Sequence, residues 1–68
     1  MVRMDLLQEA IDDSGMTMAA IAKKSNIERT TLYNRLAGVG EFKASEIDGL
    51  TKALRLTREE RDIIFFYA

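Results

Sequence analysis

The 68-residue sequence contains no cysteine, histidine, tryptophan or proline. Without cysteine there is no disulfide and no thiolate nucleophile, and without histidine the commonest acid-base side chain and metal ligand are missing. We therefore expect no catalytic centre, no cofactor and no metal site. An enzyme, such as a small hydrolase or a metal protein, is the least favoured functional class.

Long apolar runs are missing as well. No stretch approaches the roughly 18 apolar residues of a membrane span. The first thirteen residues, MVRMDLLQEAIDD, carry acids where a signal peptide would be apolar. We expect a cytoplasmic protein with no membrane partner and no small-molecule substrate. The length fits one domain, residues 1–68, near the lower end of sizes that fold alone.

Charge is nearly balanced but unevenly distributed. The net charge is −1, which argues against a protein that binds nucleic acid only through a basic surface. Residues 1–16 carry one basic and four acidic residues, whereas residues 17–44 carry five basic and two acidic residues. The positive charge is therefore concentrated in the middle of the chain, although a chain of this length can show such a fluctuation by chance.

Apolar residues recur at helical spacing in five segments, and no segment reads as a strand. Gly15 is expected to end the first helix, and Thr57 with Glu60 three residues later forms a capping box for the last one. The fold class expected is all-α, a five-helix bundle. The expected helices run from about Arg3 to Ser14, Thr17 to Lys24, Glu28 to Gly38, Ala44 to Leu54, and Thr57 to the chain end, with residues 25–27 as the turn between the second and third.

The segment from Thr17 to Gly38 has the spacing of a DNA-reading helix-turn-helix. The Thr17 hydroxyl can cap the first of its two helices. Asn26 tolerates a left-handed backbone and suits the turn, while Ile27 returns an apolar side chain to the core. In the second helix Leu32 and Leu36 share one face. The opposite face carries hydrogen-bonding side chains, as base-edge reading requires: Thr30, Thr31, Asn34 and, at its border, Tyr33.

Several further motifs complete a pattern that covers almost the whole chain. They are Leu7 and Gly15, residues 19–24 (AAIAKK), residues 25–27 (SNI), residues 30–32 (TTL), residues 35–38 (RLAG), Phe42, residues 46–47 (EI), residues 54–57 (LRLT) and residues 63–66 (IIFF). The chain resembles the lambda-repressor-like, Cro/CI-type helix-turn-helix family, in particular small Cro-like regulators of phages and prophages. The resemblance implies that the third helix enters the major groove and that a homodimer binds a palindromic double-stranded DNA operator.

Carried over by position, the resemblance implies base-edge roles for Glu28, Arg29, Thr30 and Asn34, with Tyr33 stacking on a sugar or touching a thymine methyl. Arg29 is the leading candidate because a guanidinium can pair with guanine O6 and N7 together. Two alternatives stay open. Arg29 can instead pair with a surface acid such as Glu28, and Asn34 can simply be solvated.

The resemblance also implies phosphate contacts outside the recognition helix. Thr17 and Met18 fall where relatives hold a phosphate with backbone N–H groups and often a glutamine, a bond that the Met18 side chain cannot make. Lys43 and Arg35 are candidates for phosphates that flank the groove, with a solvated surface charge as the alternative for each.

Several positions depart from the pattern, among them Glu28, Lys43 and the pair Ile11 and Leu36, which is apolar where some repressors carry an arginine and a glutamate. Glu28 stands where many relatives carry serine or threonine, so its carboxylate either accepts from cytosine N4 or complements the helix dipole. Lys43 stands where relatives often have a threonine cap, so we expect Ser45, with Asp48 three residues later, to cap the fourth helix.

Residues 63–67 form a run of five apolar side chains at the end of the chain. One helix in a small bundle cannot hide all of them, so Ile64 and Phe65 are expected at a two-fold dimer interface. The inward stripe is expected to be Ile63, Phe66 and Tyr67. The alternative is that all five complete the core.

Two functions follow from the sequence. The first is a sequence-specific transcriptional regulator, a Cro/CI-like repressor or the DNA-binding half of a longer one, which blocks promoter DNA. The second is a protein-interaction module on the same scaffold, such as an antirepressor or antitoxin, which the acidic balance and the apolar tail favour.

Overall fold

Five helices and no strands are found among residues 2–66, the part of the chain that the structure, a computed structural model, describes. The all-helical bundle expected from the apolar spacing is therefore confirmed. None of the helices in this range is long and apolar enough to cross a membrane. The helices are α1 (Met4–Ser14), α2 (Met18–Ser25), α3 (Arg29–Leu36), α4 (Ala44–Ala53) and α5 (Arg58–Phe65).

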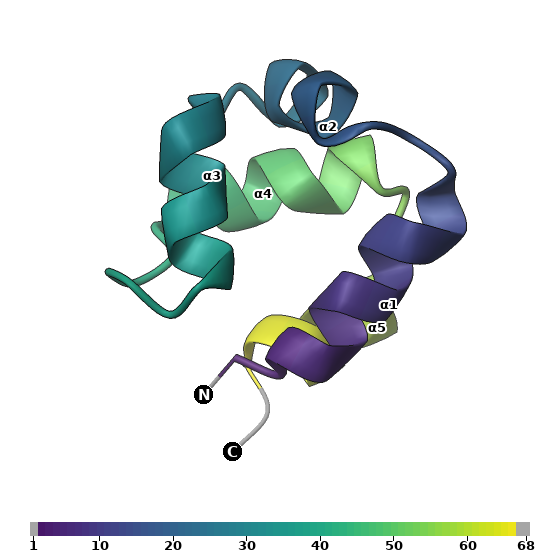
Figure 1. The fold of residues 1–68 in the computed structure, drawn as a ribbon. Coiled ribbons are helices and arrows are strands. Elements are labelled where there is room, and N and C mark those ends of the chain that lie inside the picture. Colours follow the sequence, from purple (N-terminus) through teal and green to yellow (C-terminus); the bar gives the residue numbers. More distant parts are fainter. Residues whose placement is uncertain (1, 67–68) are drawn as a thin grey trace.

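The core lies where α4 meets the other helices. α4 runs through the middle of the molecule and packs most extensively on α2, while α1 and α5 lie side by side, away from α3 (Figure 1). Each helix contributes its apolar stripe to one cluster of buried side chains. The side chains with no exposed surface are Leu7, Ile21, Leu32 and Leu50.

Local sequence signals set most of the helix ends. The Thr17 hydroxyl accepts a hydrogen bond from the N–H of Ala20 at 3.1 Å, and Gly15 ends α1 in the left-handed conformation with φ 69°. At α5 the Thr57 hydroxyl accepts from the Glu60 N–H at 3.1 Å, and the Glu60 carboxylate accepts from the Thr57 N–H at 2.8 Å. These three predicted caps are confirmed.

The start of α4 differs from the prediction. Lys43, not Ser45, is the N-cap residue, and α4 begins directly after it at Ala44. The Glu46 carboxylate reaches back and accepts from the Lys43 N–H at 2.9 Å. Because this acid satisfies a free N–H of the first turn, the helix can begin without a hydroxyl cap. Ser45 lies inside the helix and is exposed, so the expected cap was wrong.

The apolar tail turns the opposite way from the prediction. Ile64 and Phe65 are each only 4% exposed, whereas Ile63 is 48% and Phe66 57% exposed. The Phe65 ring packs edge-on against Phe42, with ring centroids 5.4 Å apart. Both the expected inward stripe and the assignment of Ile64 and Phe65 to a dimer interface were therefore wrong. Tyr67, the third member of that stripe, lies outside the described residues.

Candidate functional site

The outer side of α3 and the residue before it present a face of polar side chains that are not engaged elsewhere in the described part of the chain. All five are exposed, and none forms a side-chain hydrogen bond or an ion pair with any other residue between 2 and 66. In particular, Arg29 does not pair with Glu28 or another acid in that range, so its guanidinium is free to meet a ligand. The five are Glu28, Arg29, Thr30, Tyr33 and Asn34, all of them predicted site residues.

The connection between α2 and α3 fixes the direction of this face. Asn26 adopts the predicted left-handed conformation with φ 59° and ψ 38°. The N–H of Ile27 donates to the Ala22 carbonyl at 3.0 Å, and the Ile27 side chain is only 7% exposed. Leu32 is fully buried on the inner side of α3. The outer side of the helix is thereby held toward solvent at the edge of the molecule (Figure 1).

Arg35 has a structural role that the sequence did not reveal. Its Nε donates to the Glu46 carboxylate of α4 at 3.2 Å, and its Nη1 donates to the Val39 carbonyl at 3.3 Å. The Arg35 side chain is 16% exposed and that of Glu46 is 11% exposed. Because Arg35 is turned inward to tie α3 to α4, the predicted phosphate contact does not fit it. Glu46 is the positioning residue that the sequence reasoning missed.

The loop after α3 is shaped around the same guanidinium. Gly40 has a φ of 76°, and a Cβ at this position would collide with the Arg35 guanidinium. The Val39 N–H donates back to the Asn34 carbonyl at 2.8 Å. The end of α3 and its loop are therefore held together by backbone groups and by Arg35, without any side chain of the polar face.

Four exposed cations lie on α2, on α3 and directly before α4. Lys23 and Lys24 lie at the end of α2, Arg29 opens α3, and Lys43 directly precedes α4. None of the four forms an ion pair within the described part of the chain. This matches the positive excess of the middle segment, although Lys23 and Lys24 were not among the predicted site residues.

The start of α2 contributes in a more limited way. The Thr17 side chain is exposed but is used by its own helix, where it accepts from Ala20. The Met18 side chain is partly buried and packs against the core. Backbone N–H groups of this first turn and the hydroxyl proton of Thr17 can therefore donate to a ligand, whereas the Met18 thioether offers no donor.

Comparison with known proteins returns no relatives: no family model matches the chain, no curated protein matches it, and no solved structure matches it.

Proposed function

We propose that the chain is a sequence-specific DNA-binding transcriptional regulator of the lambda-repressor-like helix-turn-helix type, with α3 as the recognition helix. The observation that carries the proposal is the free polar face of α3. The side chains of Arg29, Thr30 and Asn34 are exposed and form no hydrogen bond or ion pair within residues 2–66. Hydrogen-bonding side chains without a partner contribute little to the stability of a fold, so these three are available to a ligand. Their chemistry suits base edges in the major groove.

The two sides of α3 have different roles, and this difference supports the proposal. Leu32 and Arg35 hold the helix to the bundle, so the remaining side chains are presented on a rigid support. A precise support matters because bidentate pairing of an arginine with guanine needs a fixed geometry. In this proposal Arg29 reads a guanine, Asn34 an adenine, and Tyr33, 51% exposed, contacts a sugar or a thymine methyl.

The cations around the face position the duplex in this proposal. Lys43 contacts a phosphate on one side of the groove, and Lys23 and Lys24 extend the positive surface on the other. Because the whole chain has a net charge of −1, sequence-independent attraction is weak, and affinity depends on base contacts to a larger extent than in a strongly basic protein.

A two-fold homodimer on a palindromic operator completes the proposal. The recognition helices of the two copies would lie about 34–36 Å apart, one helical turn of DNA. With Ile64 and Phe65 in the core, the half-exposed Phe66 at the end of α5 becomes the apolar side chain available for the contact between copies.

The direct test is selection of binding sites from a library of randomised duplexes, followed by fluorescence anisotropy with the enriched site at several salt concentrations. We expect a two-fold symmetric site bound about 10³-fold or more tightly than random duplex. If no sequence is enriched, the DNA-binding proposal fails and the protein-interaction module replaces it.

A further inference from the structure

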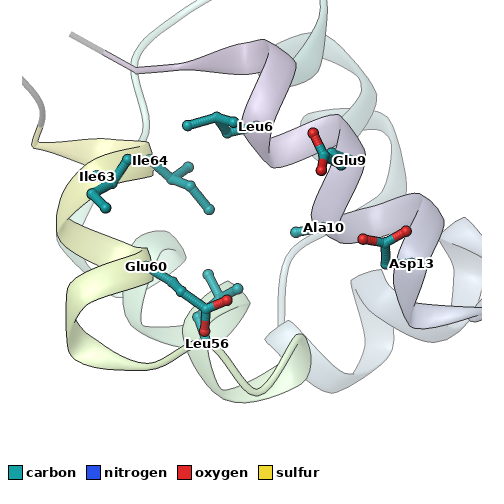
Figure 2. A pocket seen from close by; sticks show the side chains of 8 residues that line it. All are labelled: Leu6, Glu9, Ala10, Asp13, Leu56, Glu60, Ile63 and Ile64. Atoms are coloured by element: carbon teal, nitrogen blue, oxygen red, sulfur yellow. The ribbon is translucent and has the colours of Figure 1, made fainter.

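A groove of about 190 Å³ runs between α1 and α5. Figure 2 shows its walls: side chains of α1 face those of α5 and of the residue before the α5 cap, with an open space between them. Its floor is aliphatic. The apolar side chains are Leu6, Ala10, Leu56, Ile63 and Ile64.

The rim of the groove is acidic on both sides. Glu9 and Asp13 line it from α1 and Glu60 from α5, and none of the eight lining residues is basic. The Glu60 carboxylate is fixed in place because it accepts from the Thr57 N–H at 2.8 Å. Glu9 and Asp13 form no hydrogen bond or ion pair with other residues in the described range. Their charges are therefore available to a ligand.

The size of the groove indicates what can enter it. Pockets that bury a small molecule usually enclose about 300–1,000 Å³, more than this groove offers. One or two aliphatic side chains from a larger partner would fill it. Ile63, which is 48% exposed, would then be removed from water, and this burial of apolar surface favours binding.

The acidic rim selects among partners. A second copy docked across a two-fold axis would bring Glu9, Asp13 and Glu60 against the same residues of its neighbour, and like charges oppose such a contact. A phosphate backbone is excluded for the same reason. The groove needs a partner that is apolar at its floor and cationic at its rim. A segment with lysine or arginine beside an aliphatic side chain fits, because the methylene chain of lysine or arginine is apolar and its end carries a positive charge.

We propose that the groove between α1 and α5 binds a protein partner through a segment in which aliphatic side chains are flanked by lysine or arginine. This inference does not rest on DNA binding by α3. α1 and α5 lie away from α3 (Figure 1), so a partner held in the groove leaves the polar face of α3 open.

The probe is a fluorescein-labelled helical peptide with the repeat AKKL. One matched peptide carries glutamate in place of every lysine, and another carries serine in place of every leucine. We expect the AKKL peptide to bind and each matched peptide to bind about tenfold more weakly or not at all. Methyl NMR should place the bound peptide at Leu6, Ala10 and Ile63.

Two variants test the groove itself. Ile63→Ser removes an exposed apolar contact and should weaken the AKKL peptide about fivefold or more. The double variant Glu9→Lys with Asp13→Lys should lose the AKKL peptide and gain the glutamate peptide, because it reverses the rim charge. The matched controls are Val39→Ser, which removes an exposed apolar side chain outside the groove, and Glu41→Lys, which reverses an exposed acid outside it.

Four outcomes would overturn the proposal. The first is no binding of the AKKL peptide up to about 1 mM. The second is binding that Val39→Ser or Glu41→Lys weakens as much as the groove variants do, which would mean general attraction to an acidic protein. The third is equal binding of the serine peptide. The fourth is self-association that Ile63→Ser abolishes, which would make a second copy the occupant. Circular dichroism of each variant separates loss of binding from loss of fold.

Discussion

Gly49 of α4 lies directly against the carbonyl group of Ser25, the last residue of α2, with no room between them for a Cβ atom. Ser25 is itself buried, and its hydroxyl donates to the Ile21 carbonyl at 2.7 Å. Helices α2 and α4 thus cross at a glycine. The close crossing explains why α4 tolerates a residue that ordinarily weakens a helix.

Gly49→Ala should destabilise the protein even though alanine favours a helix by about 1 kcal/mol over glycine. The added methyl must push α2 away from α4, so we expect the free energy of unfolding to fall by about 1–3 kcal/mol. Urea denaturation measures this, with Ser45→Ala at an exposed position of the same helix as the control. A Gly49→Ala protein as stable as the parent would show that the crossing is looser than described.

Arg29→Ala should weaken binding to the selected site by about 1–3 kcal/mol and relax the preference at one base pair, while leaving the melting temperature unchanged. The reason is that the Arg29 side chain is exposed and forms no hydrogen bond or ion pair with another residue between 2 and 66. Anisotropy titrations on the selected site and on single-base variants measure both effects. Arg58→Ala, an exposed arginine at the start of α5, is the control. Equal loss on selected and random duplexes would contradict base reading.

Lys43→Ala should weaken binding to all duplexes to a similar extent. Loss of one phosphate contact should reduce the slope of log K against log salt by about 0.9. The measurement is a salt titration on selected and random sites, with Lys52→Ala as the control, since Lys52 pairs with Asp48 at 3.1 Å. An unchanged slope for Lys43→Ala would mean that this lysine points away from DNA.

Arg35→Ala should lower the free energy of unfolding and leave the salt dependence of DNA binding unchanged. Because the Arg35 and Glu46 side chains are mostly shielded from solvent, we expect a loss of about 1–2 kcal/mol in the free energy of unfolding. A double-mutant cycle with Glu46→Ala should give a coupling of about 1 kcal/mol. The salt slope of DNA binding should stay the same below the melting transition. A reduced slope with no coupling to Glu46 would restore the phosphate role.

Phe65→Ser should lower the stability of the domain, whereas Phe66→Ser should mainly weaken self-association. Phe65 is buried against Phe42, so its replacement should cost about 3–5 kcal/mol and unfold much of this small domain. Phe66 is more than half exposed, and within residues 2–66 its ring contacts the Arg61 guanidinium, 5.8 Å from the ring centroid, so its replacement should cost about 1 kcal/mol or less. It should instead weaken self-association in sedimentation equilibrium. The reverse pattern would contradict the observed orientation of α5.

Local chemistry made most of the fold predictable. Thr17, Asn26 and Thr57 each act through bonds to the backbone within a few residues, so their roles can be inferred without knowledge of the tertiary structure. Gly15 behaved as expected for the same reason, and Ile27, the apolar residue that follows the turn, is buried as its place in the motif predicts.

The features that could not be predicted from the sequence, the orientation of the α5 side chains and the partner of Arg35, depend on contacts between distant segments. The first five residues of α5, 58–62, are all charged, so no apolar residue there indicates the rotation of the tail. The contact of Phe65 with Phe42, a residue far away in the sequence, was therefore not predictable. Arg35 resembled a surface cation because its partner, Glu46, is eleven residues away on another helix. The base-edge roles of the α3 face remain predictions.

The hydrogen bond from the Arg3 N–H to the Ile64 carbonyl, 2.7 Å long, has a consequence for dynamics. Arg3 is the N-cap residue of α1, so its amide has no partner within that helix. Formation of α1 alone cannot protect this proton from exchange with solvent, whereas docking of α1 on α5 can. The rate of hydrogen exchange at Arg3 therefore reports how often the two helices separate, and an occupant of the groove between them should slow it.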